Sequence, residues 1–291
     1  MRALDLLVEK PQVFMGGTAG LDEAGAALLG VPLDLTASFR PGTRFGPAKV
    51  REVSHALEEY SPELHRELDE AAFHDCGDVR LGPEGVSMSL GRIREAVQEL
   101  LALGKLPVLM GGEHLLTLAA VGPLRSRYPD LAVIQMDAHA DLRNDYLGQT
   151  LSHATVMRRV VEQIGPENLF QLGIRSGTRE EFIFAGERTR LHRNRVFEPM
   201  VHEVLPRLAG KPVYVTLDID VVDPAYAPAT GTPEPGGVSS AEVLETVRAL
   251  KEARVVGFDV VEFCPPADHS DITAVLVAKI VRECILALGR A

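Results

Sequence analysis

Short, almost uninterrupted apolar runs recur along the chain, and no other feature constrains the fold as strongly. Runs this short and this apolar are typical of strands covered on both faces, as in a parallel sheet between two layers of helices. We therefore predict buried parallel strands at residues 25–32, 106–110, 131–137, 169–174, 212–218 and 255–262.

Segments of helical periodicity lie between these runs. Apolar residues spaced by three or four predict helices at 47–60, with Pro47 at the first position; at 90–101, ended by Gly104; and at 240–250, capped by Ser240. A nearly all-apolar segment at 272–288 predicts a buried C-terminal helix. The alternation indicates the α/β class, with a doubly wound parallel sheet in a single three-layer domain over residues 1–291.

Composition excludes several kinds of partner. The net charge of −11 disfavours nucleic acid and anionic membranes, because both bind basic surfaces. No run approaches the roughly 20 apolar residues that span a bilayer. The chain has three cysteines, Cys76, Cys264 and Cys284, far apart and without a CxxC pair, which fits a reducing compartment. We expect a cytoplasmic protein with no nucleic-acid or membrane partner.

Acidic and histidine residues follow three of the predicted strands. If the chain stays extended after 131–137, side chains two residues apart lie on one side of it. Carboxyl ends of parallel strands meet at one edge of the sheet, where ligands bind in such folds. We therefore expect six side chains to converge at this edge: His114, Asp137, His139, Asp141, Asp218 and Asp220.

Such a cluster needs counter-cations. Four neighbouring carboxylates raise one another's pKa and cannot all stay ionised alone, whereas two divalent ions would neutralise them. Oxygen and imidazole donors suit Mn²⁺ better than a thiolate-bound Zn²⁺, and a pair of ions would hold a bridging hydroxide as a nucleophile. A lone aspartate at a strand end is more often a cap or turn former. The alternation after two strands favours a metal site.

Several motifs make the chain resemble the ureohydrolases, which include arginases and agmatinases. They are SFRPGTRFGP at 38–47, GGEH at 111–114, DAHAD at 137–141, SHAT at 152–155, DIDVVDPAYAPATGTPEPGG at 218–237 and GFDVVEFCP at 257–265. The resemblance extends from about residue 29 to the C-terminus. It implies an arginase-like fold, trimers or hexamers, and two Mn²⁺ per subunit on the six residues named above.

The resemblance also implies catalytic roles, since family members hydrolyse a guanidinium group to urea and an amine. Glu262 is expected to end its strand and hold the guanidinium bidentately. His153 would pass a proton to the leaving amine, Asp141 would join the catalytic set, and Thr232 would line the site. Each has a plain alternative: Glu262 as a cap, His153 at a helix start, and Thr232 in a turn.

The open question is which group the substrate carries at the end opposite its guanidinium, here called its tail. Ser176 stands where arginases typically carry an acid, and TPEPGG at 232–237 resembles agmatinases. We predict hydrolysis of agmatine to putrescine and urea, with Glu181 near the substrate ammonium. Arginine and guanidinobutyrate remain alternatives, because Arg143 or Arg175 could hold a carboxylate. The chain could instead be a catalytically silent, metal-binding subunit of an oligomer, although its complete ligand set argues against that.

Overall fold

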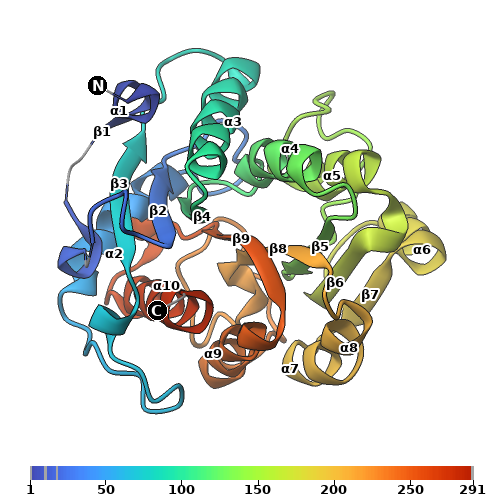
Figure 1. The fold of residues 1–291 in the computed structure, drawn as a ribbon. Helices are drawn as coiled ribbons and strands as arrows, with labels where there is room; N and C mark the ends of the chain where they lie inside the picture. The colour runs from blue at the N-terminus through green and yellow to red at the C-terminus, as the bar shows by residue number, and fades with distance from the viewer. Residues whose placement is uncertain (1, 10–11, 18, 290–291) are drawn as a thin grey trace.

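A nine-stranded β-sheet runs through the centre of the computed structural model, which describes residues 2–9, 12–17 and 19–289 (Figure 1). The strand order is β1-β3-β2-β4-β9-β8-β5-β6-β7. Every neighbouring pair is parallel except β1 and β3. The strands are β1 (Val8–Glu9), β2 (Ala26–Val31), β3 (Phe73–Val79), β4 (Leu106–Gly111), β5 (Ala132–Met136), β6 (Leu169–Ile174), β7 (Arg190–Arg193), β8 (Pro212–Asp218) and β9 (Arg254–Val261).

All six predicted strands are confirmed, but three strands were missed. β3 carries Asp75 and Asp78, two buried acids that pair with Arg51 of a helix. Because of these acids, the sequence of β3 lacks the apolar pattern of a buried strand. β7 is a short edge strand whose end residues are exposed arginines, as protected sheet edges often are. β1 has only two residues, and its antiparallel pairing corrects the expectation of a wholly parallel sheet.

Helices cover both faces of the sheet (Figure 1), which confirms the three-layer α/β architecture. The helices on one face are α1 (Ala3–Leu7), α3 (Val86–Ala102), α4 (Leu116–Arg127), α5 (Val156–Ile164) and α6 (Arg179–Arg188). Those on the other face are α2 (Gly46–Ser54), α7 (Phe197–Pro199), α8 (Leu205–Arg207), α9 (Ser240–Ala249) and α10 (Ile272–Leu288).

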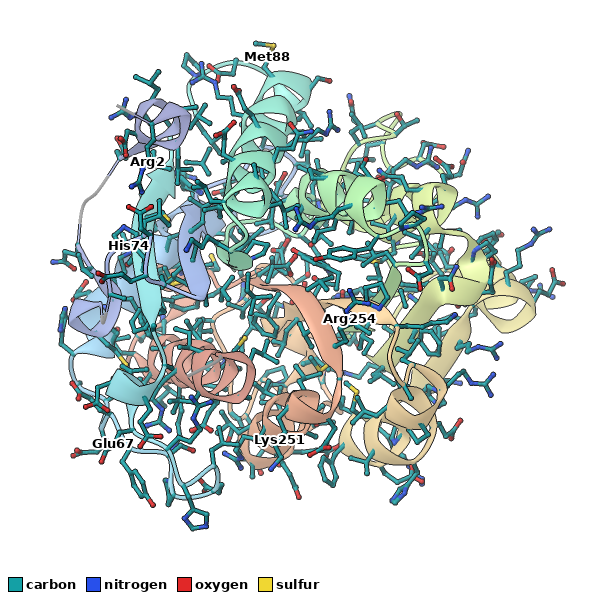
Figure 2. All side chains as sticks on the ribbon, in the orientation of Figure 1. Arg2, Glu67, His74, Met88, Lys251 and Arg254 are labelled. Atoms are coloured by element: carbon teal, nitrogen blue, oxygen red, sulfur yellow. The ribbon has the colours of Figure 1, made fainter. Side chains whose placement is uncertain are left out.

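Side chains fill the space on both sides of the sheet (Figure 2). Along β8, Val213 and Val215 join the core beneath α9 and α10, whereas Tyr214 between them joins the core beneath α3 and α4. This alternation follows from the two-residue period of a strand and explains why both sets of positions are mostly apolar.

The helix boundaries differ from expectation in four places. α3 runs from Val86 to Ala102, so it begins four residues before the predicted segment 90–101. α2 ends at Ser54, so Leu57 and Tyr60 lie beyond it; Leu57 still packs on the core from the turn that follows, which explains the misleading spacing. Pro47 is the second residue of α2 instead of the first. Ser239, not Ser240, caps α9, because its hydroxyl accepts the Glu242 N–H at 3.1 Å. α10 spans the predicted residues.

The carboxyl ends of β4, β9, β8 and β5 lie side by side in the sheet and form the edge on which the candidate site is built. After β4, Gly112 runs against the backbone of Leu33, where an added Cβ would lie 2.0 Å from the Leu33 carbonyl oxygen. This close approach requires the glycine. In the described part of the chain, no helix is long and apolar enough to cross a membrane.

Candidate metal centre

Six side chains predicted to bind metal converge at this edge of the sheet. The path that brings them together differs from the predicted one. β5 ends at Met136, His139 forms an isolated bridge with Ser176, and Asp141 adopts a left-handed backbone with φ of 53°. The chain therefore coils around the site instead of staying extended. The six are His114, Asp137, His139, Asp141, Asp218 and Asp220.

The first group surrounds His114, in the connection from β4 to α4. Its Nδ1 atom lies 3.1 Å from Asp137 Oδ2, 3.1 Å from Asp141 Oδ2 and 3.4 Å from Asp218 Oδ2. Asp218 is the last residue of β8, and Asp137 follows β5 directly. All four residues are buried.

The second group surrounds His139. Its Nδ1 atom lies 2.8 Å from Asp220 Oδ2 and 3.8 Å from Asp137 Oδ1. The ligand atoms of Asp137, His139 and Asp220 all lie within 4.8 Å of one another, as do those of His114, Asp137 and Asp218. Asp137 thus belongs to both groups, which is the arrangement that a pair of neighbouring ions requires.

Burial and mutual repulsion govern the charges of this cluster. Burial, with the nearby Asp220 and Asp141, raises the pKa of Asp137 to about 7. Burial alone would lower the pKa of His139, but the carboxylate of Asp220 raises it to about 11. In turn, His139 overcomes the effect of burial and lowers the pKa of Asp220 to about 2. Protons and imidazolium groups thus balance the acids, and a bound cation would displace those protons.

The donor atoms fit divalent cations. His114 Nδ1 and Asp220 Oδ2 are buried and have no hydrogen-bond partner among the described residues. A carboxylate oxygen of Asp137 nevertheless lies close to the first atom, and the His139 ring lies close to the second. Buried polar atoms are normally paired, so unpaired ones need an explanation such as an ion. Neither group contains a cysteine. Oxygen and imidazole donors suit a hard or borderline ion.

A cavity of about 220 Å³ opens above the cluster. Its wall includes His114, His139, Asp141 and Asp218 from the cluster, whereas Asp137 and Asp220 lie beneath it. The remaining residues predicted for the site also line this cavity: His153, Glu181, Thr232 and Glu262.

Glu262 lies just past β9 and not within it, and its φ of 64° turns the chain at this point. Its Oε1 atom accepts the backbone N–H of His114 at 2.7 Å, which fixes the carboxylate beside the cluster. Burial raises the pKa of Glu262 to about 8. A cation entering the cavity would favour the ionised carboxylate.

His153 begins a 3₁₀ turn (His153–Thr155) that leads into α5, so it is a helix-start residue and a cavity residue at once. Its Nδ1 lies 3.2 Å from Thr36 Oγ1 and its Nε2 lies 3.4 Å from Ser38 Oγ. The backbone N–H of His153 donates to Thr36 Oγ1 at 3.0 Å. Burial lowers the pKa of His153, so the ring is neutral at pH 7.

Thr36 and Ser38 were missed by the sequence reasoning. The signal was at hand, because Ser38 opens the SFRPGTRFGP motif, which carries part of the family resemblance. Glu113 holds this segment over the cavity by accepting the backbone N–H groups of Leu35 at 3.0 Å and Thr36 at 2.7 Å. The segment thus supplies two hydroxyl groups to His153.

The cavity wall also carries one acidic and one basic residue, Glu181 and Arg143. Glu181 accepts the backbone N–H groups of Leu142 at 2.9 Å and Thr178 at 2.7 Å, and so caps α6. It also lies 3.5 Å from Nε of Arg143, another cavity residue. Arg175 does not line the cavity; its guanidinium donates to backbone carbonyls, including that of Glu234.

Comparison with known proteins agrees with this geometry. Residues 24–287 match the model of the arginase family. The chain belongs to the arginase family. It is 50% identical over 278 residues to an agmatinase of Bacillus anthracis, covering 94% of this chain and 96% of the relative. A guanidinobutyrase of Pseudomonas aeruginosa is 33% identical over 281 residues, covering 93% and 88%.

The fold of solved arginase-family proteins matches as well. The agmatine ureohydrolase of Thermoplasma volcanium superposes with a TM-score of 0.86 at 31% identity, covering 96% of this chain and 95% of that one. The predicted arginase-like fold and family are therefore confirmed, and this arginase-family chain is a hydrolase.

Proposed function

We propose that this protein hydrolyses agmatine to putrescine and urea in a manganese-dependent reaction. The observation that carries the proposal is the pair of ligand groups sharing Asp137 beneath a cavity walled by Glu262 and His153. The agmatinase relative at 50% identity supports the choice of substrate.

Two Mn²⁺ ions would be held by the two groups, one around His114 and one around His139, with Asp137 shared and Asp141 beside His114. When bound, such a pair supplies a hydroxide nucleophile at neutral pH and polarises the guanidinium carbon. The all-oxygen-and-imidazole donor set supports manganese over a thiolate-preferring ion.

Glu262 would bind the substrate guanidinium. A carboxylate matches the planar fork of a guanidinium in charge and in shape, and this one is held in place by its bond to the His114 backbone. Because burial disfavours an unpaired charge on Glu262, the carboxylate would be stabilised by a cationic partner such as a guanidinium. Thr232 would close the same side of the cavity.

His153 would move the proton that the leaving amine needs. Its ring is neutral at pH 7, so it can accept a proton from the reacting group and pass it to the amine nitrogen. Thr36 engages Nδ1, which leaves Nε2 near the hydroxyl of Ser38, another cavity residue. We therefore assign the transfer to Nε2.

The cavity residues Glu181 and Arg143 would determine which group the substrate can carry at the end opposite its guanidinium. Glu181 offers negative charge to the ammonium of agmatine. If it does so, Glu181→Gln raises KM for agmatine and leaves kcat nearly unchanged; an unaltered KM removes the role.

A guanidino acid is the second candidate, because Arg143 also lines the wall and could pair with a carboxylate. Arg175 has less support as the partner of such a carboxylate, since its donors are occupied by backbone carbonyls. Arg143→Gln should impair guanidinobutyrate hydrolysis far more than agmatine hydrolysis if the guanidino acid is the substrate. We also propose a homotrimer or homohexamer, which light scattering would test.

Urea release tests the function directly. Metal-stripped protein would be assayed with agmatine, arginine and 4-guanidinobutyrate, with and without added Mn²⁺. We expect manganese-dependent urea from agmatine. Urea from guanidinobutyrate or arginine instead would overturn the proposal that agmatine is the substrate. No urea from any of the three compounds would favour the catalytically silent subunit.

A further inference from the structure

A column of buried polar side chains extends from His114 away from the cavity and into the core. Thr216 Oγ1 lies 2.9 Å from His114 Nε2, and Thr117 Oγ1 lies 3.2 Å from Thr216 Oγ1. Thr117 Oγ1 in turn donates to Asp259 Oδ2 at 2.7 Å. Thr117, Thr216 and Asp259 are fully buried, and none of them contacts the cavity.

Three elements bring the column together. Thr216 on β8 is the register partner of Asp259 on β9, and Thr117 lies in the first turn of α4, which covers this face of the sheet. Tyr214, two residues before Thr216 on the same face, donates its hydroxyl to the same Oδ2 atom of Asp259. Gly257 gives the Tyr214 ring its space, because an added Cβ would lie 2.7 Å from the ring.

The column has a direction, because a hydroxyl group has a single hydrogen to donate. Thr117 gives its hydrogen to Asp259, so its oxygen must accept from Thr216. Thr216 has then used its hydrogen, so its oxygen must accept from His114, which places a hydrogen on Nε2. Asp259 Oδ2 receives hydrogen bonds from both Thr117 and Tyr214, so this direction holds whatever the state of Oδ1.

We propose that Asp259 is a positioning residue that acts through Thr117 and Thr216 to hold the Nε2–H tautomer of His114. With Nε2 occupied by a hydrogen, Nδ1 is the atom that offers a lone pair, and Nδ1 is the atom surrounded by Asp137, Asp141 and Asp218. A metal-binding histidine needs this arrangement, in which the second ring nitrogen donates to a fixed partner. The inference rests on the metal centre of the proposed function.

The test measures Mn²⁺ affinity by calorimetry on metal-stripped, full-length protein. Thr216→Val removes the acceptor at equal size and should weaken binding by about 10- to 100-fold, the usual effect of losing such a partner. Thr216→Ser keeps the hydroxyl and should restore the affinity. Asp259→Leu should weaken binding in the same way, whereas Asp259→Asn retains a carbonyl oxygen toward Thr117 and should bind nearly as well as the wild type.

Tyr214→Phe is the matched control. It removes a hydrogen bond from the same oxygen of Asp259 but leaves the column to His114 intact, so the Mn²⁺ affinity should not change. A loss in Tyr214→Phe as large as in Thr216→Val would show a general packing effect and overturn the proposal. Wild-type affinity in both Thr216→Val and Asp259→Leu would overturn it as well.

A second readout does not depend on activity. In ¹⁵N-histidine-labelled protein loaded with Zn²⁺ as a diamagnetic probe, His114 should show a slowly exchanging proton on Nε2, assigned by its absence in His114→Asn. A proton on Nδ1 would contradict the proposal. Urea assays run in parallel separate the two hypotheses: two bound ions without urea release would reject the proposed function alone, and absence of any bound ion would reject both.

Discussion

In the described part of the chain, a buried cluster of acids at β3 and another at the carboxyl ends of β5 and β8 are completed in opposite ways. At β3, Arg51 donates to Asp75 at 2.8 Å and to Asp78, and Asp75 also accepts the backbone N–H groups of Phe14 and Gly77. At the carboxyl ends of β5 and β8, four aspartates face two histidines, and buried ligand atoms remain without hydrogen-bond partners among the described residues.

The difference separates a structural cluster from a binding site. The Arg51 cluster supplies its own cation, and the fold adapts to it: at Gly30 an added Cβ would lie 1.7 Å from Asp78 Oδ1. The aspartate cluster relies on protons and imidazolium groups instead of a permanent cation, leaves ligand atoms without hydrogen-bond partners among the described residues, and opens onto a cavity. We infer that the first cluster stabilises the fold and that the second requires ions from outside.

Loss of the shared ligand should have the largest effect. Asp137→Asn removes the carboxylate common to both ligand groups, so Mn²⁺ affinity and urea release should each fall by more than the roughly 100-fold typical of an outer partner. Calorimetry and a urea assay measure the two losses. Near-normal binding in this variant would show that the ions lie elsewhere.

Arg51→Met should act on stability alone. Removal of one partner of a buried ion pair leaves uncompensated charge and typically costs about 3–5 kcal/mol of unfolding free energy. Guanidinium chloride unfolding gives this value, and metal analysis of the folded protein should still find the wild-type ion content. A cost below about 1 kcal/mol, typical of exposed pairs, would contradict the role assigned to Arg51.

Manganese should stabilise the wild type through linkage. At a free concentration 100 times Kd, each site adds about 2.7 kcal/mol to the unfolding free energy. Thermal or denaturant unfolding with and without Mn²⁺ measures this gain, which Arg51→Met should retain and Asp137→Asn should lose. An equal gain in Asp137→Asn would indicate binding outside the cluster.

The smallest effect is expected at Thr36. Thr36→Val removes the hydroxyl that contacts the ring and backbone of His153, a loss of about 1–1.5 kcal/mol or roughly a tenfold fall in kcat, with KM little changed. Thr36→Ser is the matched control and should keep the wild-type rate. Steady-state kinetics with agmatine would decide, and a change confined to KM would reject a role in proton transfer.

The comparison also shows what the sequence could and could not predict. Strands such as β5 and β8 are apolar at most of their buried positions, so a local pattern revealed them. β3 was missed because Asp75 and Asp78 are buried against Arg51, which lies on another element. A pairing of this kind is visible only once the chain is folded.

The candidate site also has features that the sequence could predict and features that it could not. Ligand types and their places after strands were enough to predict that the six candidate metal ligands meet. The left-handed turn at Asp141 was not predictable from alternation, because spacing assumes an extended chain. Thr36 was not predicted because it lies 117 residues from His153 in the sequence. Asp259 was not predicted, although the motif GFDVVEFCP includes it, because its partners come from α4 and β8.

One measurement tests the central claim most directly: titration of metal-stripped protein with Mn²⁺, following bound ions per chain and urea release from agmatine in the same samples. We predict two bound ions per chain in the wild type and in Arg51→Met, with urea release appearing as the sites fill, and loss of both in Asp137→Asn. Urea release without bound metal, or full ion binding in Asp137→Asn, would contradict the conclusion that this cluster is the metal centre.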